Sequence, residues 1–150
     1  MIERDDILQL IPHQGGMCLL DRVLSWDEAN IHCQSRAHVR ADMPLRSNGR
    51  LRGVHLCEFG AQSMAVHGGL LARAEGGRAL PGLLVALRSV RIACDWIEDL
   101  PGPLDVYGDK LSASDAGWQY RFRVEHAGDC LAEGRAAVMP APCGINGSWG

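Results

Sequence analysis

Long apolar runs are absent from this sequence of 150 residues. No stretch approaches the ~20 consecutive apolar residues that a membrane-spanning helix needs. The first ten residues, MIERDDILQL, are acidic and lack the layout of a signal peptide. We therefore expect a cytoplasmic protein that does not act in a membrane.

Clustered positive charge and closely spaced metal ligands are also missing. The formal net charge is −3, and the arginines of segment 46–52 have no aromatic residues between them, so we expect no nucleic-acid partner. The six cysteines include no C-x-x-C pair, and the six histidines form no H-x-H or H-x₃-H pair near a carboxylate cluster. These spacings argue against a zinc or redox site, and we expect neither a metal nor a cofactor.

The remaining composition is that of one globular domain, with 47% hydrophobic and 22% charged residues. The pattern predicts a short helix over 3–10, a hairpin around 27–30, a loop over 40–52 and a long apolar helix over 53–71. Four strand-like stretches follow, over 82–97, 103–115, 118–126 and 129–140, with turn residues between the last three. We therefore expect an α+β domain over 1–140, an antiparallel sheet around one central helix, and a frayed tail over 141–150.

The long helix carries polar residues in an apolar setting. The stretch RGVHLCEFGAQSMAVHGGLL contains His55, Glu58, Gln62 and His67, although charged side chains are rarely buried without partners. His55 and Glu58 are three residues apart and lie on one helix face, with Gln62 one turn beyond Glu58. These three residues are the candidate catalytic groups. We expect six other helix residues to be mostly buried: Val54, Leu56, Cys57, Ala61, Met64 and Ala65.

Structural interpretations of the same residues remain open. Glu58 could be a buried carboxylate bonded to Gln62 or to the N-terminus of a helix. His55 could be an ordinary, partly exposed residue. His67 could interact favourably with the dipole at the C-terminal end of the helix.

Two motifs resemble a known family. LIPHQGGMCLLDRVLSWD resembles the start of bacterial 3-hydroxyacyl-acyl carrier protein dehydratases, and the helix repeats their pattern of Gly53 followed by Glu58, Ala61 and Gln62. The sequence is more similar still to the dehydratase-like proteins of aryl-polyene pigment clusters. Those proteins share Pro-His-x-Gly-x-Met-x-Leu-Leu-Asp-Arg-Val, Glu-x-x-Ala-Gln and a following His-x-Gly. The resemblance covers residues 8–140.

The resemblance implies a hotdog fold that acts on an acyl thioester of acyl carrier protein or coenzyme A. It implies paired chains, in which a His and a Glu from opposite subunits share the proton transfers. It also implies that the N–H groups at the helix start, here Gly53 and Val54, bind the thioester carbonyl. His13 is expected to order the loop before the first strand, and Asp21 and Arg22 to form a strand-level or interface ion pair.

One position departs from the family. The dehydratases have a catalytic His fourteen residues before the helix Glu, and this sequence has Pro44 there. His55 could replace it. We therefore expect a dehydratase-like protein of fatty-acid or polyene-type biosynthesis. Two alternatives stay open: a hotdog acyl thioesterase that uses Glu58, or a catalytically incomplete subunit. The chain would form a homodimer, or a heterodimer with a second hotdog chain.

Overall fold

The structure is a computed structural model that describes residues 1–11, 15–77 and 82–140. The predicted tail over 141–150 and His13 lie outside the described residues. The helical elements are α1 (Arg4–Leu10), α2 (Leu56–Ala74) and three 3₁₀ turns, η1 (Gly15–Met17), η2 (Ala37–Val39) and η3 (Gly53–His55). The strands are β1 (Ile2–Glu3), β2 (Arg22–Trp26), β3 (Asn30–Ser35), β4 (Gly82–Ile92), β5 (Leu104–Ser114), β6 (Gly117–His126) and β7 (Asp129–Pro140).

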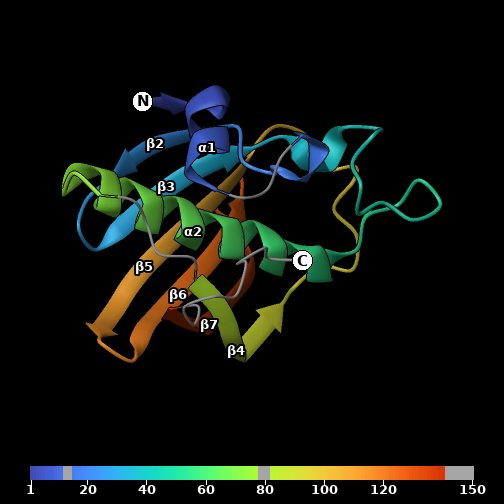
Figure 1. The fold of residues 1–150 in the computed structure, drawn as a ribbon. Helices are drawn as coiled ribbons and strands as arrows, with labels where there is room; N and C mark the ends of the chain where they lie inside the picture. Colours follow the sequence, from blue (N-terminus) through green and yellow to red (C-terminus); the bar gives the residue numbers. More distant parts are fainter. Residues whose placement is uncertain (12–14, 78–81, 141–150) are drawn as a thin grey trace.

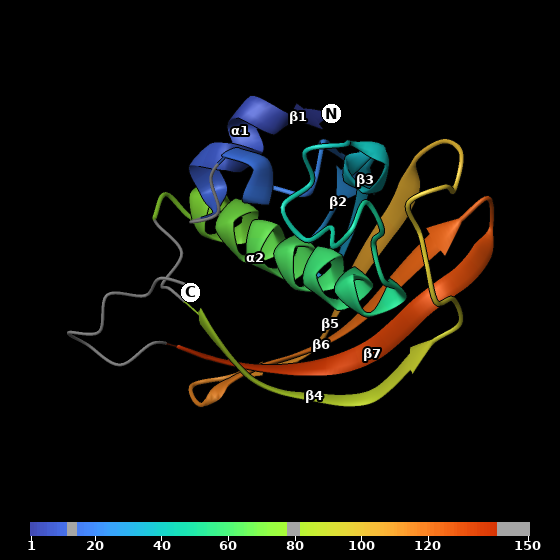
Figure 2. The same cartoon turned by 90° about the vertical axis from the view of Figure 1, so that its right-hand side faces the viewer.

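The seven strands form one antiparallel sheet in the order β1-β2-β3-β5-β6-β7-β4. The sheet curves around α2, which crosses its concave side, while α1 lies on the other side of α2 (Figures 1 and 2). This arrangement is the hotdog fold, and the predicted fold class is confirmed. Strand β4 pairs with β7 alone and forms one edge of the sheet.

The core lies between α2 and the sheet. Leu56, Phe59 and Val66 of α2 are fully buried, and so are the alternate residues Leu104 and Val106 of β5. Small residues let the two layers approach closely. A methyl group added at Gly60 would lie 2.5 Å from the Phe122 ring on β6, so glycine is needed at this crossing.

One face of α2 is less buried than the sequence suggested. Val54 of η3 and four residues of α2, Glu58, Ala61, Ala65 and Gly68, recur every three or four residues, and all five are half-buried or exposed. We call this the open face of α2. Val54 is 54% exposed, so the prediction that it is mostly buried is wrong for the single chain. The sheet covers the opposite face of the helix, where the larger apolar side chains lie.

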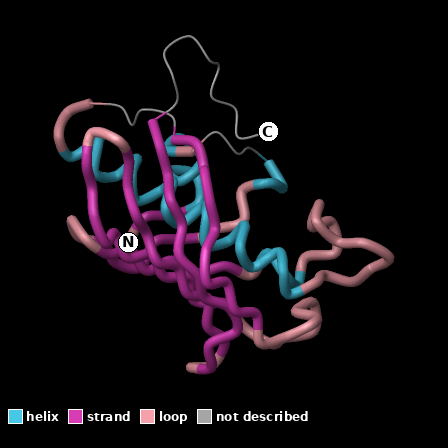
Figure 3. Tube along the Cα trace, turned by 90° about the horizontal axis from the view of Figure 1, so that it is seen from below, coloured by secondary structure: helices cyan, strands magenta, loops and turns pink. Residues whose placement is uncertain are grey.

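The predicted loop over 40–52 contains a tight hairpin. The N–H group of Ser47 donates to the carbonyl of Arg50 at 2.8 Å, and the N–H group of Arg50 returns a bond at 3.0 Å. Between them, Asn48 and Gly49 have φ angles of 53° and 74°, as a type I′ turn requires. We call residues 43–52 the arm. It extends beyond the ends of the strands (Figures 1 and 3).

None of the described helices is long and apolar enough to cross a membrane.

Candidate functional site

Gln62 joins the two sequence motifs. Its side-chain oxygen accepts a bond from the N–H group of Leu19 at 2.8 Å, and its NH₂ group donates to the carbonyl of Met17 at 2.7 Å. Gln62 is 1% exposed, and Ser35 also donates to the carbonyl of Leu19. The amide therefore fixes the segment before β2 against α2, one helical turn from Glu58.

Glu58 lies in the first turn of α2, on the open face. The neighbouring Cys57 is half-buried, and burial raises the pKa of its thiol, with a further rise from the charge of Glu58. The thiol is therefore neutral near pH 7 and does not supply a thiolate nucleophile. Glu58 is the carboxyl side chain that the open face presents at this end of the helix.

Gly53 performs a structural task at the start of the helix. Its N–H group donates to the carbonyl of Asp95 at 2.8 Å, and a methyl group there would lie 2.1 Å from the carbonyl oxygen of Cys94. The N–H group of Gly53 is therefore engaged in this structure and not open to a thioester carbonyl. The substrate contact predicted for Val54 stays a prediction.

His55 lies beside the arm. It lines a hollow of about 220 Å³ at the N-terminal end of α2, together with residues of the arm and Trp96. The guanidinium of Arg50 lies 3.7 Å from the centre of the Trp96 ring, and that of Arg52 lies 5.4 Å from it. His55 therefore shares this hollow with the cationic side chains of Arg50 and Arg52.

Glu98 fixes two neighbouring residues of the arm, Arg50 and Leu51, at the hollow. Its carboxylate accepts a bond from Arg50 Nε at 2.8 Å and another from the N–H group of Leu51 at 3.2 Å. The hydrogen bond from Arg50 lowers the pKa of Glu98 to about 2, so this carboxylate is ionised at neutral pH. Sequence reasoning did not identify Glu98 or Trp96, because both lie about forty-five residues after the arm and no short spacing connects them to it.

His67 is a buried structural residue. Its Nε2 lies 2.8 Å from the carbonyl of Asp27, and its Nδ1 lies 2.7 Å from the Tyr120 hydroxyl. A carbonyl only accepts, so Nε2 carries the proton and Nδ1 accepts from Tyr120. Burial lowers the pKa of His67 and raises that of Tyr120. His67 is therefore neutral. The interpretation of His67 as a cation that interacts with the dipole at the helix C-terminus is wrong.

His67 and Glu58 lie on the same helix, α2, but far apart along it. Nine residues separate them, which is about 14 Å along a helix. Asp21, which precedes β2, and Arg22 of β2 both form ion pairs. Asp21 lies 3.5 Å from Arg4, and Arg22 lies 4.0 Å from Glu3. These two residues thus make strand-level ion pairs with the N-terminal segment.

The position of the family's loop histidine lies on the arm. Pro44 is exposed there, and the sequence has no histidine over 42–52. Within the described ranges, no three or more His, Cys, Asp or Glu residues gather as metal ligands. The chain on its own therefore brings Glu58 to the site without a histidine from this loop.

A family model described as ApeP-like, ApeP dehydratase, matches residues 5–145. The chain belongs to the ApeP-like family. No curated protein matches the sequence. Among solved structures, this ApeP-like protein is similar to the dehydratase heterocomplex ApeI:P from Xenorhabdus doucetiae, with a TM-score of 0.79, 23% identity and 90% of each chain covered.

Two further structures share the fold of the ApeP-like protein. AziG from S. sahachiroi has a TM-score of 0.60 and 19% identity, with 87% of this chain and 97% of that one covered. A hypothetical thioesterase with coenzyme A from Streptococcus pneumoniae has a TM-score of 0.58 and 11% identity, with 80% and 84% covered. The predicted resemblance and the dehydratase-like assignment are confirmed by the family match.

Proposed function

We propose that this chain is one half of a composite dehydratase for 3-hydroxyacyl thioesters. It supplies Glu58, and a second hotdog chain supplies the histidine that the arm lacks. The observation that carries the proposal is the half-buried Glu58 on the open face of α2, with proline at the family's histidine position. The similar ApeI:P structure, which is described as a heterocomplex, supports pairing with a different chain.

The edge strand β4 is the surface on which the second chain would pair. Leu87, Val90 and Ile92 are 40%, 37% and 37% exposed, and an apolar edge strand is normally covered or paired. This edge leads to the catalytic end of the helix, because Ile92 Cγ2 lies 3.0 Å from where a methyl group on Gly53 would be. A chain paired with β4 would therefore lie beside the start of α2 and close to Glu58.

The reaction removes water from the acyl chain. The histidine of the second chain takes the proton from the carbon next to the thioester carbonyl, and Glu58 gives a proton to the departing hydroxyl group. The products are the 2-enoyl thioester and water. The N–H group of Val54, at the positive end of α2, would polarise the carbonyl. Gln62 is a positioning residue that keeps segment 17–19 against the helix beside Glu58.

His55 is the alternative candidate for the catalytic base in this proposal. It lies three residues before Glu58 and on the same side of the helix. However, it lines the hollow beside the arm with Arg50 and Arg52, whereas the family resemblance implies a histidine from the opposite subunit. A histidine from the second chain is therefore the preferred base.

A reconstitution experiment tests the proposal. The chain, its candidate hotdog partner and their mixture are assayed with 3-hydroxyacyl thioesters for formation of the conjugated enoyl product. We expect turnover from the mixture and none from this chain alone. Full turnover by this chain alone would contradict the need for a second subunit and would favour His55 as the base.

A thioesterase is the second candidate. A carboxylate can activate water for thioester hydrolysis without a loop histidine, and Glu58 is such a carboxylate. The fold is shared with a hypothetical thioesterase from Streptococcus pneumoniae. Release of free thiol without an enoyl product, measured in the same reactions, would favour this function over dehydration.

A further inference from the structure

Positive charge is concentrated around the arm of a chain that is acidic overall. Residues 36–55 contain five arginines and one acidic residue, while the whole chain has a formal net charge of −3. The sequence predicted a loop over 40–52. The structure instead gives the arm an ordered hairpin and a hollow lined by Arg50, Arg52, His55 and Trp96.

We propose that this hollow binds the phosphate group of the phosphopantetheine chain that carries the thioester. The inference rests on the proposed function, because it names the residues that would bind the phosphopantetheine of that substrate. Phosphopantetheine links the thioester to a phosphate ester both in coenzyme A and in acyl carrier proteins. The chemistry that the hollow recognises is therefore the phosphate ester, whichever carrier supplies it.

The backbone around the hollow and the side chain of Arg50 are held in place before any ligand binds. Segment 51–53 pairs with segment 95–97 through Gly53 N–H to Asp95, Ile97 N–H to Leu51 and a bridge between Arg52 and Trp96. Arg50 stacks on the Trp96 ring and is held by Glu98. A fixed guanidinium group loses little side-chain freedom on binding an anion, and its planar donors match the oxygens of a phosphate.

The surplus charge comes from Arg52. Glu98 balances Arg50, whereas Arg52 forms no ion pair with any residue in the described part of the chain. His55 and the positive end of the 19-residue helix α2 lie at the same place. An anion with several oxygen atoms is the ligand class that this combination favours. Ser47 and Asn48 of the arm add polar groups to the lining.

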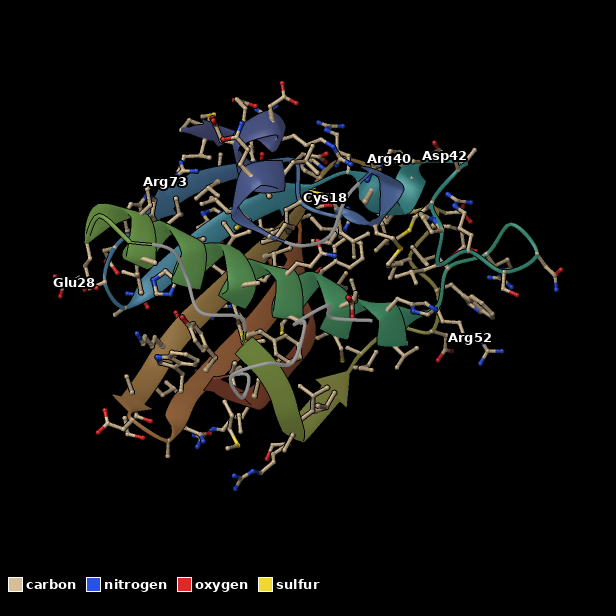
Figure 4. All side chains as sticks on the ribbon, viewed as in Figure 1. Cys18, Glu28, Arg40, Asp42, Arg52 and Arg73 are labelled. Atoms are coloured by element: carbon tan, nitrogen blue, oxygen red, sulfur yellow. The ribbon has the colours of Figure 1, made fainter. Side chains whose placement is uncertain are left out.

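The hollow lies at the end of α2 that presents Glu58, and its lining continues from His55 to residues of the hairpin and Trp96. An acyl group held on the open face at Glu58 would have its thioester near the start of α2. The phosphopantetheine chain beyond the thioester would then leave the site past the hollow. Figure 4 shows Arg52 at this end of α2 and Arg73 at the other end.

Binding of two matched ligands tests the inference. The complex of this chain with its partner is titrated with a 3-hydroxyacyl-phosphopantetheine and with the same acyl-pantetheine, which lacks the phosphate, each with an amide in place of the thioester. We expect the phosphate to improve affinity by about tenfold or more, as charge-assisted hydrogen bonds do. Arg52→Ala should remove this difference, and Arg73→Ala, which removes the same charge at the other end of α2, should not.

Each result of these titrations either supports the phosphate-binding inference or contradicts it. Equal affinities for the two ligands would overturn the inference, and so would an equal effect of the two variants, which would indicate long-range attraction only. If acyl-pantetheine thioesters are dehydrated without any preference for phosphate, the proposed function stands and this inference falls. Parallel titrations with the acyl-coenzyme A and acyl-carrier protein amides, in Arg52→Ala and the unmodified complex, identify the carrier that supplies the phosphate.

Discussion

The side chain of Gln62 accepts a hydrogen bond from the backbone of Leu19 at 2.8 Å, across 43 residues of sequence. Together with the bond to Met17, this contact is the physical link between the two motifs by which the sequence resembles its family. The motifs occur together because the helix amide satisfies two backbone groups that would otherwise be buried without partners. Gln62 thus connects the fold to the site.

The first prediction concerns this link. Gln62→Leu keeps the volume but leaves the N–H group of Leu19 and the carbonyl of Met17 without their partner. We expect the free energy of unfolding to fall by about 1–3 kcal/mol, the usual cost of an unsatisfied buried group. Urea unfolding measures this. Gln119→Leu, at an exposed position on β6, is the control, and equal stability of the two variants would contradict the structural role of Gln62.

The second prediction is a loss of stability in mild acid. Burial lowers the pKa of both His38 and His67 in the folded chain. The unfolded chain therefore binds more protons than the folded chain as the pH falls below about 6.5, the ordinary histidine value. Stability should be fully present above that pH and fall below it, by at most ~1.4 kcal/mol per pH unit for each histidine.

Urea unfolding between pH 8 and pH 5.5 checks this dependence. His67→Gln keeps an N–H donor within reach of Asp27 but does not titrate, so its stability should fall less steeply with acid than that of the unmodified chain. His55→Gln, which changes a half-buried histidine at the other end of the helix, serves as the comparison. A slope unchanged by His67→Gln would mean that His67 is not the buried neutral group described above.

The third prediction compares two glycines of α2. A methyl group at Gly60 would lie 2.5 Å from the Phe122 ring, whereas one at Gly68 would meet nothing within 4 Å. Gly60→Ala should destabilise the chain by about 1–3 kcal/mol through overpacking. Gly68→Ala should stabilise the isolated chain by about 0.5–1 kcal/mol through helix propensity. Thermal melting distinguishes them, and a stable Gly60→Ala variant would contradict the close packing of α2 on β6.

The fourth prediction concerns pairing through β4. Val90→Lys places a charge on an edge strand at a site that is already 37% exposed in the single chain. The fold should survive while association with the second chain weakens by at least about tenfold, because burying an unpaired charge is costly. Leu111→Lys changes a more exposed residue on β5 and should leave association unchanged. Sedimentation velocity measures both, and unaltered pairing in Val90→Lys would exclude this edge.

Much of the fold followed from the sequence because its signals are local. The alternation over 104–114 and 117–126 reflects one buried and one exposed sheet face, and the turns between these strands carry their own residue signals. The expected helix over 53–71 is present as a 3₁₀ turn and a 19-residue helix. The open face was harder to foresee, because its small residues are equally typical of a buried helix.

The site was less predictable because its contacts join distant segments. Gly53 suggested room for a ligand, but the space is taken by the carbonyl of Cys94, forty-one residues later. The partner of His67 is Tyr120, which no spacing rule connects to it. The arm contains the Asn48-Gly49 pair typical of a type I′ turn, yet the residues around it lack strand character. Its hairpin therefore could not be separated from an ordinary loop.

The turnover of Glu58→Gln in the reconstituted complex tests the central claim most directly. The change keeps the shape of the side chain and removes its acid–base function, and Glu75→Gln, at the exposed C-terminal end of the same helix, is the matched control. We predict that Glu58→Gln lowers dehydration of a 3-hydroxyacyl thioester by at least ~100-fold, with an unchanged melting temperature and unchanged pairing. Turnover equal to that of Glu75→Gln would contradict the account and leave this chain as a non-catalytic subunit.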